Sequence, residues 1–137
     1  GGARIIETDL AECMLVENRR KLPDEAVERV CAEALRMPFP ESFFDAVLCF
    51  GVLPHLGAAQ DALPRLWRHV KPGGMLAVGH LMDSAALNAF HAGLGDAVNR
   101  DRLPAAAELA DILRRAGAAV HAAEDEPGWY FVAAERA

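Results

Sequence analysis

The sequence predicts an α/β fold with a mostly parallel sheet that ends in an antiparallel hairpin. Strand-like apolar segments alternate with segments of helical spacing through most of the chain, as in a parallel sheet with helices on its faces. The last two strand-like segments instead follow one another, joined through a turn that contains Pro127 and Gly128. With 137 residues, 53% of them hydrophobic, the chain predicts one domain over residues 1–137.

The first part of the chain predicts a strand, a helix and a second strand. Residues 3–8 (ARIIET) are a short strand-like run that ends at Asp9, and residues 11–21 follow with helical spacing. A Leu-Pro-Asp break ends this helix. Residues 26–32 (AVERVCA) then predict a second short strand, which Glu33 closes.

The middle of the chain carries its longest apolar run. Residues 44–50 predict a strand that is covered on both faces, as in the interior of a parallel sheet. Gly51 ends the run, and the loop over residues 50–56 leaves the carboxyl end of the strand, where open α/β sheets bind ligands. Residues 58–70 predict an amphipathic helix whose regular part begins near Pro64, because an interior proline loses a hydrogen bond.

The remaining third predicts a strand, two helices and the hairpin. The sequence KPGG is expected to stop the preceding helix. Ser84 is the expected N-cap of the first helix, and Gly117 is expected to cap the second. The elements predicted here, in order, are residues 75–79, 84–98, 106–116, 118–123 and 129–134.

Composition and charge exclude several classes of protein. A net charge of −6 with scattered Lys and Arg argues against non-specific nucleic-acid binding. No apolar run approaches the roughly 20 residues that cross a bilayer, so no membrane contact is expected. The first residues lack the layout of a signal peptide, which predicts a cytoplasmic protein. The three cysteines lie far apart without a CxxC pair and are expected to be reduced core residues.

Four segments, in order, resemble a class I S-adenosylmethionine-dependent methyltransferase of the methyltransferase type 11 group, which includes quinone-biosynthesis enzymes. The segments are GARIIETDLAECML, AEALRMPFPESFFDAVLC, FGVLPHL and LWRHVKPGGMLAV. The resemblance covers the C-terminal three quarters of such a domain. It implies a Rossmann-like methyltransferase sheet, S-adenosyl-L-methionine as cofactor and a small-molecule methyl acceptor.

The resemblance implies a nucleoside site at the ends of the first two strands. Asp9 would accept hydrogen bonds from both ribose hydroxyls, and Leu10 would lie against the adenine. Glu33 would receive the adenine amino group, while the backbone N–H of Ala34 would reach a ring nitrogen. The family more often has Asp at the position of Glu33. Two alternatives stay open, in which Asp9 caps the helix that follows it and Glu33 is a solvated residue at a strand end.

The loop after the apolar strand is expected to border the reactive end of the cofactor. Phe50 and Gly51 would lie beside the methionine moiety and the sulfur, because glycine permits close backbone approach. In FGVLPHL the family commonly has two adjacent histidines, and Pro54 replaces the first of them. The remaining His55 is either a general base or a structural residue that caps a helix.

The residues that follow the next strand are the predicted substrate contacts. His80, Asn88 and His91 lie where the family's substrate-binding residues usually enter. A metal site built on His80 and His91 is an alternative that lacks a third ligand, so no metal is expected. Residues 100–102 (RDR) read as a solvated loop.

The family's glycine-rich cofactor loop is expected to precede residue 1, so the domain is predicted to be truncated at its N-terminus. A strand, turn and helix of about 40 residues would be lacking, and that strand is central in the family's sheet. A fragment of a longer protein is the favoured explanation. In the two alternatives, the remaining strands close the gap, or a second copy in a homodimer supplies the missing element. Two other functions stay open: a non-catalytic methyltransferase-like scaffold, and an NAD-dependent dehydrogenase.

Overall fold

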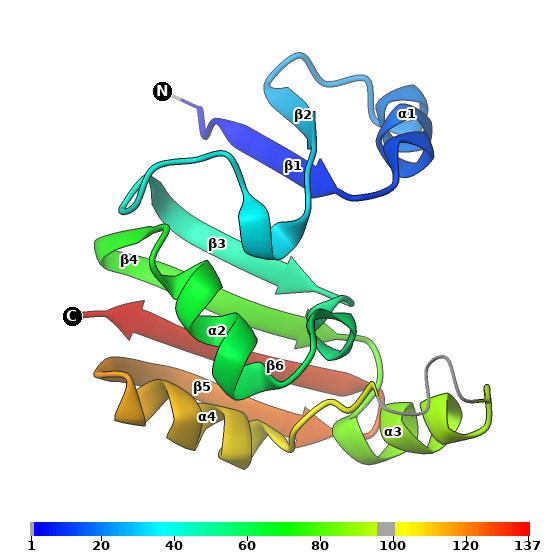
Figure 1. Cartoon of the computed structure of the whole chain (residues 1–137), viewed down its shortest axis with the longest axis vertical. Coiled ribbons are helices and arrows are strands. Elements are labelled where there is room, and N and C mark those ends of the chain that lie inside the picture. The colour runs from blue at the N-terminus through cyan, green and yellow to red at the C-terminus, as the bar shows by residue number, and fades with distance from the viewer. Residues whose placement is uncertain (1, 96–100) are drawn as a thin grey trace. The chain divides into compact units, whose positions relative to one another are not determined.

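The computed structural model describes residues 2–95 and 101–137, and the chain divides into two compact units, residues 1–38 and 39–137. Each unit has a sheet of its own, with two strands in the first and four in the second (Figure 1). No helix among the described residues has both the length and the apolar character needed to cross a bilayer.

The first unit is a strand, a helix and a parallel strand, as predicted. Glu7, in the first strand, accepts hydrogen bonds from Asn18 of the helix and from the buried guanidinium of Arg29, 2.9 Å away, in the second strand. One carboxylate therefore ties the three elements together, while Leu15 is the buried residue of the helix. The elements are β1 (Ile5–Asp9), α1 (Glu12–Lys21), β2 (Val27–Cys31) and a short 3₁₀ helix (Ala34–Arg36).

The second unit contains a mixed four-stranded sheet in the order β3-β4-β6-β5. The pair β3 and β4 is parallel, whereas β6 runs antiparallel to both β4 and β5. The predicted parallel strand pair and closing hairpin are thereby confirmed. The elements are β3 (Phe44–Phe50), a 3₁₀ helix (Leu53–Leu56), α2 (Ala59–Trp67), β4 (Val70–His80), α3 (Ser84–Ala92), α4 (Ala106–Arg115), β5 (Ala118–Glu126) and β6 (Trp129–Arg136).

The core of the second unit lies between its sheet and two helices. Helices α2 and α4 cover one face of the sheet (Figure 1), and the apolar faces of both helices are buried there. Alternate residues of β4 and β6 meet these helices, since side chains along a strand alternate between its two faces. The buried side chains of this layer include Leu63, Leu66, Leu76, Val78, Leu109, Leu113, Tyr130 and Val132.

The prediction that the strand over residues 44–50 is covered on both faces is wrong. Cys49 is buried, but Leu48 and Phe50 are 66% and 49% exposed. The strand lies at the edge of its sheet, and the helices packed on this sheet lie on one face only. A continuous apolar run shows what a strand could bury but does not show which elements cover it.

The helix expected over residues 58–70 is shorter and begins earlier than Pro64. It starts at Ala59 and holds Pro64 in its interior. The proline is tolerated because its ring and the carbonyl of Gln60, which loses a partner, both lie on the exposed side of the helix. Burial of the opposite, apolar face offsets that loss.

The KPGG sequence does not separate helix from strand as expected, because it forms an irregularity inside β4. Phe44 pairs with Val70 and Ala46 pairs with Met75, so residues 71–74 are accommodated opposite Asp45. The ammonium group of Lys71 lies 2.8 Å from the Asp45 carboxylate and lowers the pKa of that exposed group.

The two glycines of this irregularity have different reasons to be glycine. Gly73 has a φ of +75°, and a Cβ added there would meet nothing within 4 Å. A Cβ added to Gly74 would lie only 2.8 Å from the carbonyl oxygen of Asp45 and 2.9 Å from that of Lys71.

We expect Gly74→Ala to lower the free energy of unfolding of the second unit by about 3 kcal/mol, because main-chain atoms on both sides cannot give way. Gly73→Ala is the matched control and should cost only about 1 kcal/mol, for its left-handed backbone alone. Urea unfolding followed by tryptophan fluorescence measures both, since Trp67 and Trp129 lie in this unit. Equal losses in the two variants would contradict the steric explanation.

The start of α3 and the positions of the cysteines also differ from expectation. Asp83, and not Ser84, is the N-cap, and its carboxylate accepts a hydrogen bond from the backbone N–H of Ala86. The helix ends at Ala92, and residues 96–98 of the predicted helix lie outside the described residues.

Of the three cysteines only Cys49 is buried, and burial raises the pKa of its thiol to about 11. The predicted cap at Gly117 is confirmed by its φ of +86°.

Candidate functional site

The first unit brings the two predicted nucleoside-binding carboxylates to the same edge of its sheet. Asp9 is the last residue of β1, where it pairs with Cys31 of the parallel neighbour, and Glu33 follows two residues later. The backbone N–H of Ala32 donates to the carbonyl of Asp9 over 3.0 Å, which keeps the two chain segments together beyond the strands. Two carboxylates therefore lie on the same side of the sheet, at the carboxyl ends of two neighbouring strands.

The side chain of Asp9 also shapes the turn into α1. Its Oδ1 accepts a hydrogen bond of 2.8 Å from the backbone N–H of Ala11, the residue before the helix. The bond lies before the helix, and α1 has no side-chain cap, so the alternative that Asp9 caps this helix is wrong. The bond uses one carboxylate oxygen. Oδ2 has no hydrogen-bond partner among the described residues, so the carboxylate keeps acceptor capacity for a ligand.

The remaining groups of this edge are an exposed carboxylate and an exposed apolar side chain. Glu33 is exposed and lies 3.6 Å from the guanidinium of Arg36. Leu10, next to Asp9, is 72% exposed. Two acceptors beside an apolar surface are the chemistry that suits a nucleoside, with its hydroxyl and amino donors and its flat base.

In the second unit, Phe50 and Gly51 stand at the carboxyl end of β3. Gly51 has a φ of +70°, and its N–H donates to the carbonyl of Gly79 in β4 over 2.9 Å. The ring of Phe50 lies close over Gly79, where a Cβ would come within 3.0 Å of it. Gly51 therefore permits the turn after β3, and Gly79 leaves room for the ring of Phe50.

The three histidines singled out in the sequence come from separate elements of the second unit. His55 lies in the 3₁₀ helix after β3, His80 is the last residue of β4, and His91 lies in α3. The ring centroids of His55 and His91 are 5.3 Å apart, while His80 meets the ring of Tyr130 edge-on at 5.9 Å. The side chain of His55 does not cap α2, which has no side-chain cap, so the alternative that it caps this helix is wrong.

His80 is buried and differs from the other two histidines in its hydrogen bonding. Burial lowers the pKa of His80, and the proximity of His55 and His91, each of which repels a second positive charge when it is protonated, lowers it further. The ring is therefore neutral at pH 7. Among the described residues its Nε2 has no hydrogen-bond partner, although the atom is buried.

Asp101 is the residue of this site that the sequence did not identify. It was read as part of a solvated loop, but its carboxylate Oδ2 lies 2.6 Å from Nδ1 of His55. Its carbonyl oxygen accepts a hydrogen bond of 2.8 Å from Nδ1 of His91. One residue thereby contacts two of the histidines. The separation of 46 residues between His55 and Asp101 left no local pattern from which the contact could be read.

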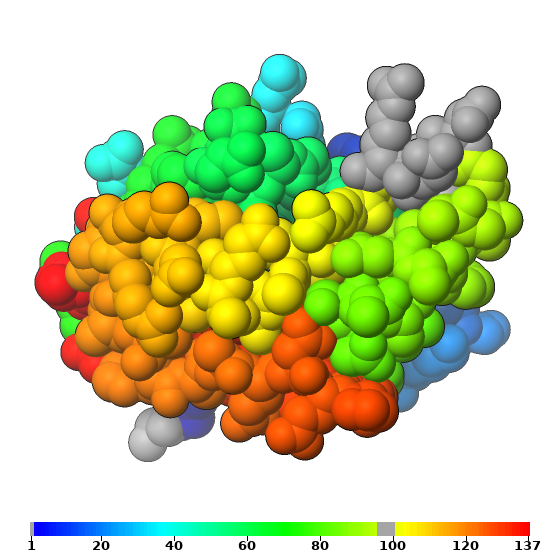
Figure 2. Space-filling view, turned by 90° about the horizontal axis from the view of Figure 1, so that it is seen from below, coloured from blue at the N-terminus to red at the C-terminus, as the bar shows by residue number. Residues whose placement is uncertain are grey.

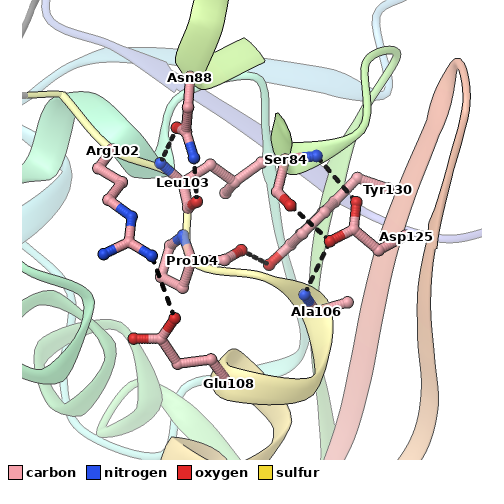
Figure 3. Close-up of polar contacts among 9 residues, drawn as sticks. All are labelled: Ser84, Asn88, Arg102, Leu103, Pro104, Ala106, Glu108, Asp125 and Tyr130. Atoms are coloured by element: carbon pink, nitrogen blue, oxygen red, sulfur yellow. Dashed lines mark hydrogen bonds and ion pairs between the residues drawn. The ribbon is translucent and has the colours of Figure 1, made fainter. Parts of the chain in front are cut away.

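Asn88, a predicted substrate contact, uses its amide on the chain itself. Its Nδ2 donates to the carbonyl of Leu103 over 2.9 Å, and its Oδ1 accepts from the N–H of the same residue over 2.8 Å (Figure 3). These two hydrogen bonds hold the segment that leads into α4 against Asn88. Its substrate contact stays a prediction, and these two bonds argue against it.

A second group of polar contacts fastens α3 and α4 to the hairpin. The Asp125 carboxylate accepts hydrogen bonds from the N–H and the hydroxyl of Ser84 and from the N–H of Ala106, over 2.8, 2.6 and 3.1 Å (Figure 3). One side chain thus satisfies a free N–H at the start of two helices. Burial alone would raise the pKa of Asp125, but these hydrogen bonds outweigh it and hold the pKa below its ordinary value.

Tyr130 contacts both His80 and the segment that precedes α4. Its side chain is fully buried, and its hydroxyl donates to the carbonyl of Pro104 over 3.0 Å. Burial, and then the negative charges of Asp125 and Glu108, raise the pKa of Tyr130, so the hydroxyl keeps its proton. In the space-filling view the yellow segment before α4 lies against the lime-green α3 (Figure 2), in agreement with these bonds.

We expect Asp125→Ala to lower the free energy of unfolding by about 1–2 kcal/mol at pH 7, because the starts of two helices lose an acceptor. The folded pKa lies below the ordinary 3.8. The stabilisation is therefore present above that value and is lost as the pH falls through the lower folded pKa. Urea unfolding at pH 7 and at acidic pH should show the two proteins converging. Glu126→Ala, at an exposed neighbour, is the control and should track the wild type.

No three His, Cys, Asp or Glu side chains come together as metal ligands within residues 2–95 and 101–137. The described histidines contact carboxylate, carbonyl and aromatic groups instead. Their arrangement suits hydrogen bonding and proton transfer.

Residues 1–78 match the family described as a methyltransferase domain. A demethylmenaquinone methyltransferase of Clavibacter sepedonicus is 37% identical over 78 residues, which are 56% of this chain and 32% of that protein. The ubiquinone/menaquinone biosynthesis C-methyltransferase UbiE of Pseudomonas fluorescens is 39% identical over 80 residues, 55% of this chain and 31% of that protein. The chain thus spans about a third of the length of these relatives.

Solved structures agree with the fold over nearly the whole chain. A SAM-dependent methyltransferase from Aquifex aeolicus is similar with a TM-score of 0.70 and 22% identity, over 98% of this chain and 69% of that one. An S-adenosylmethionine-dependent methyltransferase from Mesorhizobium loti gives 0.72 and 16%, over 98% and 82% of the two chains. At these identities the likeness concerns the fold, including the part after residue 78.

Proposed function

The chain belongs to the methyltransferase domain family, and on this premise we propose that the full-length protein transfers a methyl group from S-adenosylmethionine to a small molecule. The observation that carries the proposal is the pair of carboxylates, Asp9 and Glu33, at one edge of two neighbouring parallel strands. In its position and chemistry this edge suits the nucleoside part of the cofactor.

In this proposal each residue at the strand ends has one role toward the cofactor. The unused oxygen of Asp9 and its shared Oδ1 accept hydrogen bonds from the ribose hydroxyls, and Leu10 covers the adenine. Glu33 accepts from the adenine amino group, beside the N–H of Ala34. Phe50, with Gly51, borders the methionine part. When bound, the cofactor supplies a methyl group on a positively charged sulfur, which makes that methyl electrophilic.

The histidines of the second unit form the acceptor side of the proposal. His55, half exposed and in contact with Asp101, takes the proton that the acceptor's reacting atom gives up. His80 and His91 are buried and would contribute to the wall of the acceptor site. The relatives named for demethylmenaquinone and ubiquinone biosynthesis support an acceptor with a ring that bears oxygen.

Location and partners follow from the same proposal. We place the protein in the cytoplasm, with a small-molecule acceptor and without nucleic acid as a partner. The free edge of β3, which within the described residues pairs with β4 alone, is proposed to meet a further strand. That strand would come from additional chain or from a second copy in a homodimer.

The melting temperature of the full-length protein tests the proposal. A ligand at 100 times its Kd stabilises the folded state by about 2.7 kcal/mol, which moves the melting temperature by several degrees. S-adenosylhomocysteine, the cofactor product, should raise the melting temperature, whereas NAD should leave it unchanged. A rise with NAD and none with S-adenosylhomocysteine would replace the methyltransferase by the dehydrogenase alternative.

A further inference from the structure

His55 and Asp101 form a histidine–carboxylate pair with a geometry that differs from that of a second such pair among the described residues. In the first, Nδ1 of the imidazole faces the carboxylate at 2.6 Å, and the Asp101 side chain is only 25% exposed. In the second, Nε2 of His121 faces Glu135 at 3.0 Å, and the two side chains are 52% and 44% exposed. The first pair leaves Nε2 as the nitrogen that is not committed to the carboxylate.

The segment that carries Asp101 is held at several points. Its carbonyl oxygen accepts from His91, Leu103 is bound through both backbone groups by Asn88, and the Pro104 carbonyl accepts from Tyr130. Figure 3 shows the last two contacts on either side of the chain. The carboxylate therefore meets His55 from a backbone that is fixed in place, which is what a group that orients another side chain requires.

We infer that Asp101 is a positioning residue, which holds the proton of His55 on Nδ1 and leaves Nε2 as a proton acceptor. A carboxylate without a proton can only accept a hydrogen bond, so at 2.6 Å it selects the tautomer with Nδ1–H. The side chain of His55 is 46% exposed, so a small molecule can reach its ring.

The inference rests on the proposed function and narrows its substrate class. The acceptor would be a molecule whose reacting atom carries a proton, such as a ring hydroxyl or an acidic ring carbon. As that atom forms its bond to the methyl carbon, the carbon–sulfur bond breaks and its electron pair stays on sulfur. The acceptor's proton goes to Nε2 of His55, and the resulting imidazolium is stabilised by the Asp101 carboxylate. An acceptor that has no proton to lose would not need this pair.

Nitrogen-15 NMR of the histidine rings tests the inference in the full-length protein. Wild-type His55 should show the neutral tautomer protonated at Nδ1. Asp101→Ala should populate the form protonated at Nε2, and Asp101→Glu should restore most of the wild-type tautomer. Glu135→Gln removes the carboxylate of the other pair and should leave the His55 signals unchanged. Because the bond from His91 goes to the backbone of Asp101, it is available in every variant.

Two results would overturn the inference: His55 protonated at Nε2 in the wild type, or the same tautomer in the wild type and in Asp101→Ala. If Asp101→Ala fails to fold, Asp101→Asn keeps the volume and gives the same readout. Titration with S-adenosylhomocysteine in the same samples separates the two proposals. If Asp101→Ala shifts the His55 tautomer but S-adenosylhomocysteine does not bind, the role of Asp101 stands and the methyltransferase function is contradicted. If S-adenosylhomocysteine binds but Asp101→Ala leaves the tautomer unchanged, the function stands and the role of Asp101 is contradicted.

Discussion

Replacing Asp9 by Ala should weaken binding of S-adenosylhomocysteine to the full-length protein by about 10- to 100-fold. A hydrogen bond to a charged group contributes about 1.5–3 kcal/mol, and each 1.4 kcal/mol is a factor of ten in affinity. The Asp9 carboxylate has one oxygen without a hydrogen-bond partner among the described residues, and it lies at a strand end beside the exposed Leu10. Isothermal titration calorimetry measures the loss.

Asp9 also accepts a hydrogen bond from the backbone N–H of Ala11. The control must therefore separate an effect on this turn from an effect on ligand binding. Asp24 makes the same kind of contact, accepting the N–H of Ala26 over 2.8 Å, at the entry to β2. Asp24→Ala should therefore perturb the unit to a similar extent and leave the affinity unchanged. Equal affinities of Asp9→Ala and the wild type would remove Asp9 from the site.

Leu109→Ala should lower the free energy of unfolding of the second unit by about 2–5 kcal/mol. The side chain is fully buried on α4, which packs against β5 and β6. Removing it takes apolar atoms out of a closed layer and leaves a cavity, a loss that is large against a typical total stability of about 5–15 kcal/mol. Urea unfolding followed by tryptophan fluorescence should show a lower midpoint with an unchanged slope.

Leu81→Ala is the matched control for the core variant. Leu81 follows β4 in the same unit and is 68% exposed, so its truncation should change the stability by less than about 0.5 kcal/mol. If both leucine variants unfold at the same urea concentration, the layer between α4 and the sheet does not carry the stability of this unit.

The fold was predictable where the sequence has local signals. Alternating apolar segments placed the strands within a few residues, and the turn at Pro127 and Gly128 predicted the hairpin that β5 and β6 form. The positions of Asp9 and Glu33 were predictable for the same reason, because each lies at or just after the carboxyl end of a strand, and parallel neighbours end on the same side of a sheet. These features depend on residues that are close together in the sequence.

The errors concern places where distant residues decide the structure. Two glycines in KPGG read as a stop, but Gly74 is required by the close approach of the Asp45 carbonyl from another strand. Ser84 has the side chain of an N-cap, yet its hydroxyl is bound to Asp125 of the hairpin, while Asp83 caps the helix.

The acceptor side of the site was predicted only in part. Three histidines in separate elements could be singled out, but Asp101, which contacts His55 and His91, lies in a charged stretch that resembles a solvated loop. Asn88 has the chemistry of a binding residue, and only the structure places the backbone of Leu103 against both of its amide groups. Side-chain type therefore indicated where polar contacts form and did not indicate which partner each would take.

A crystal structure of the full-length protein with S-adenosylhomocysteine tests the central claim most directly. The account predicts both ribose hydroxyls within hydrogen-bond distance of the Asp9 carboxylate, the adenine amino group at Glu33, and the thioether sulfur beside Phe50 and Gly51. A nucleoside bound elsewhere, or bound without contact to either carboxylate, would contradict it.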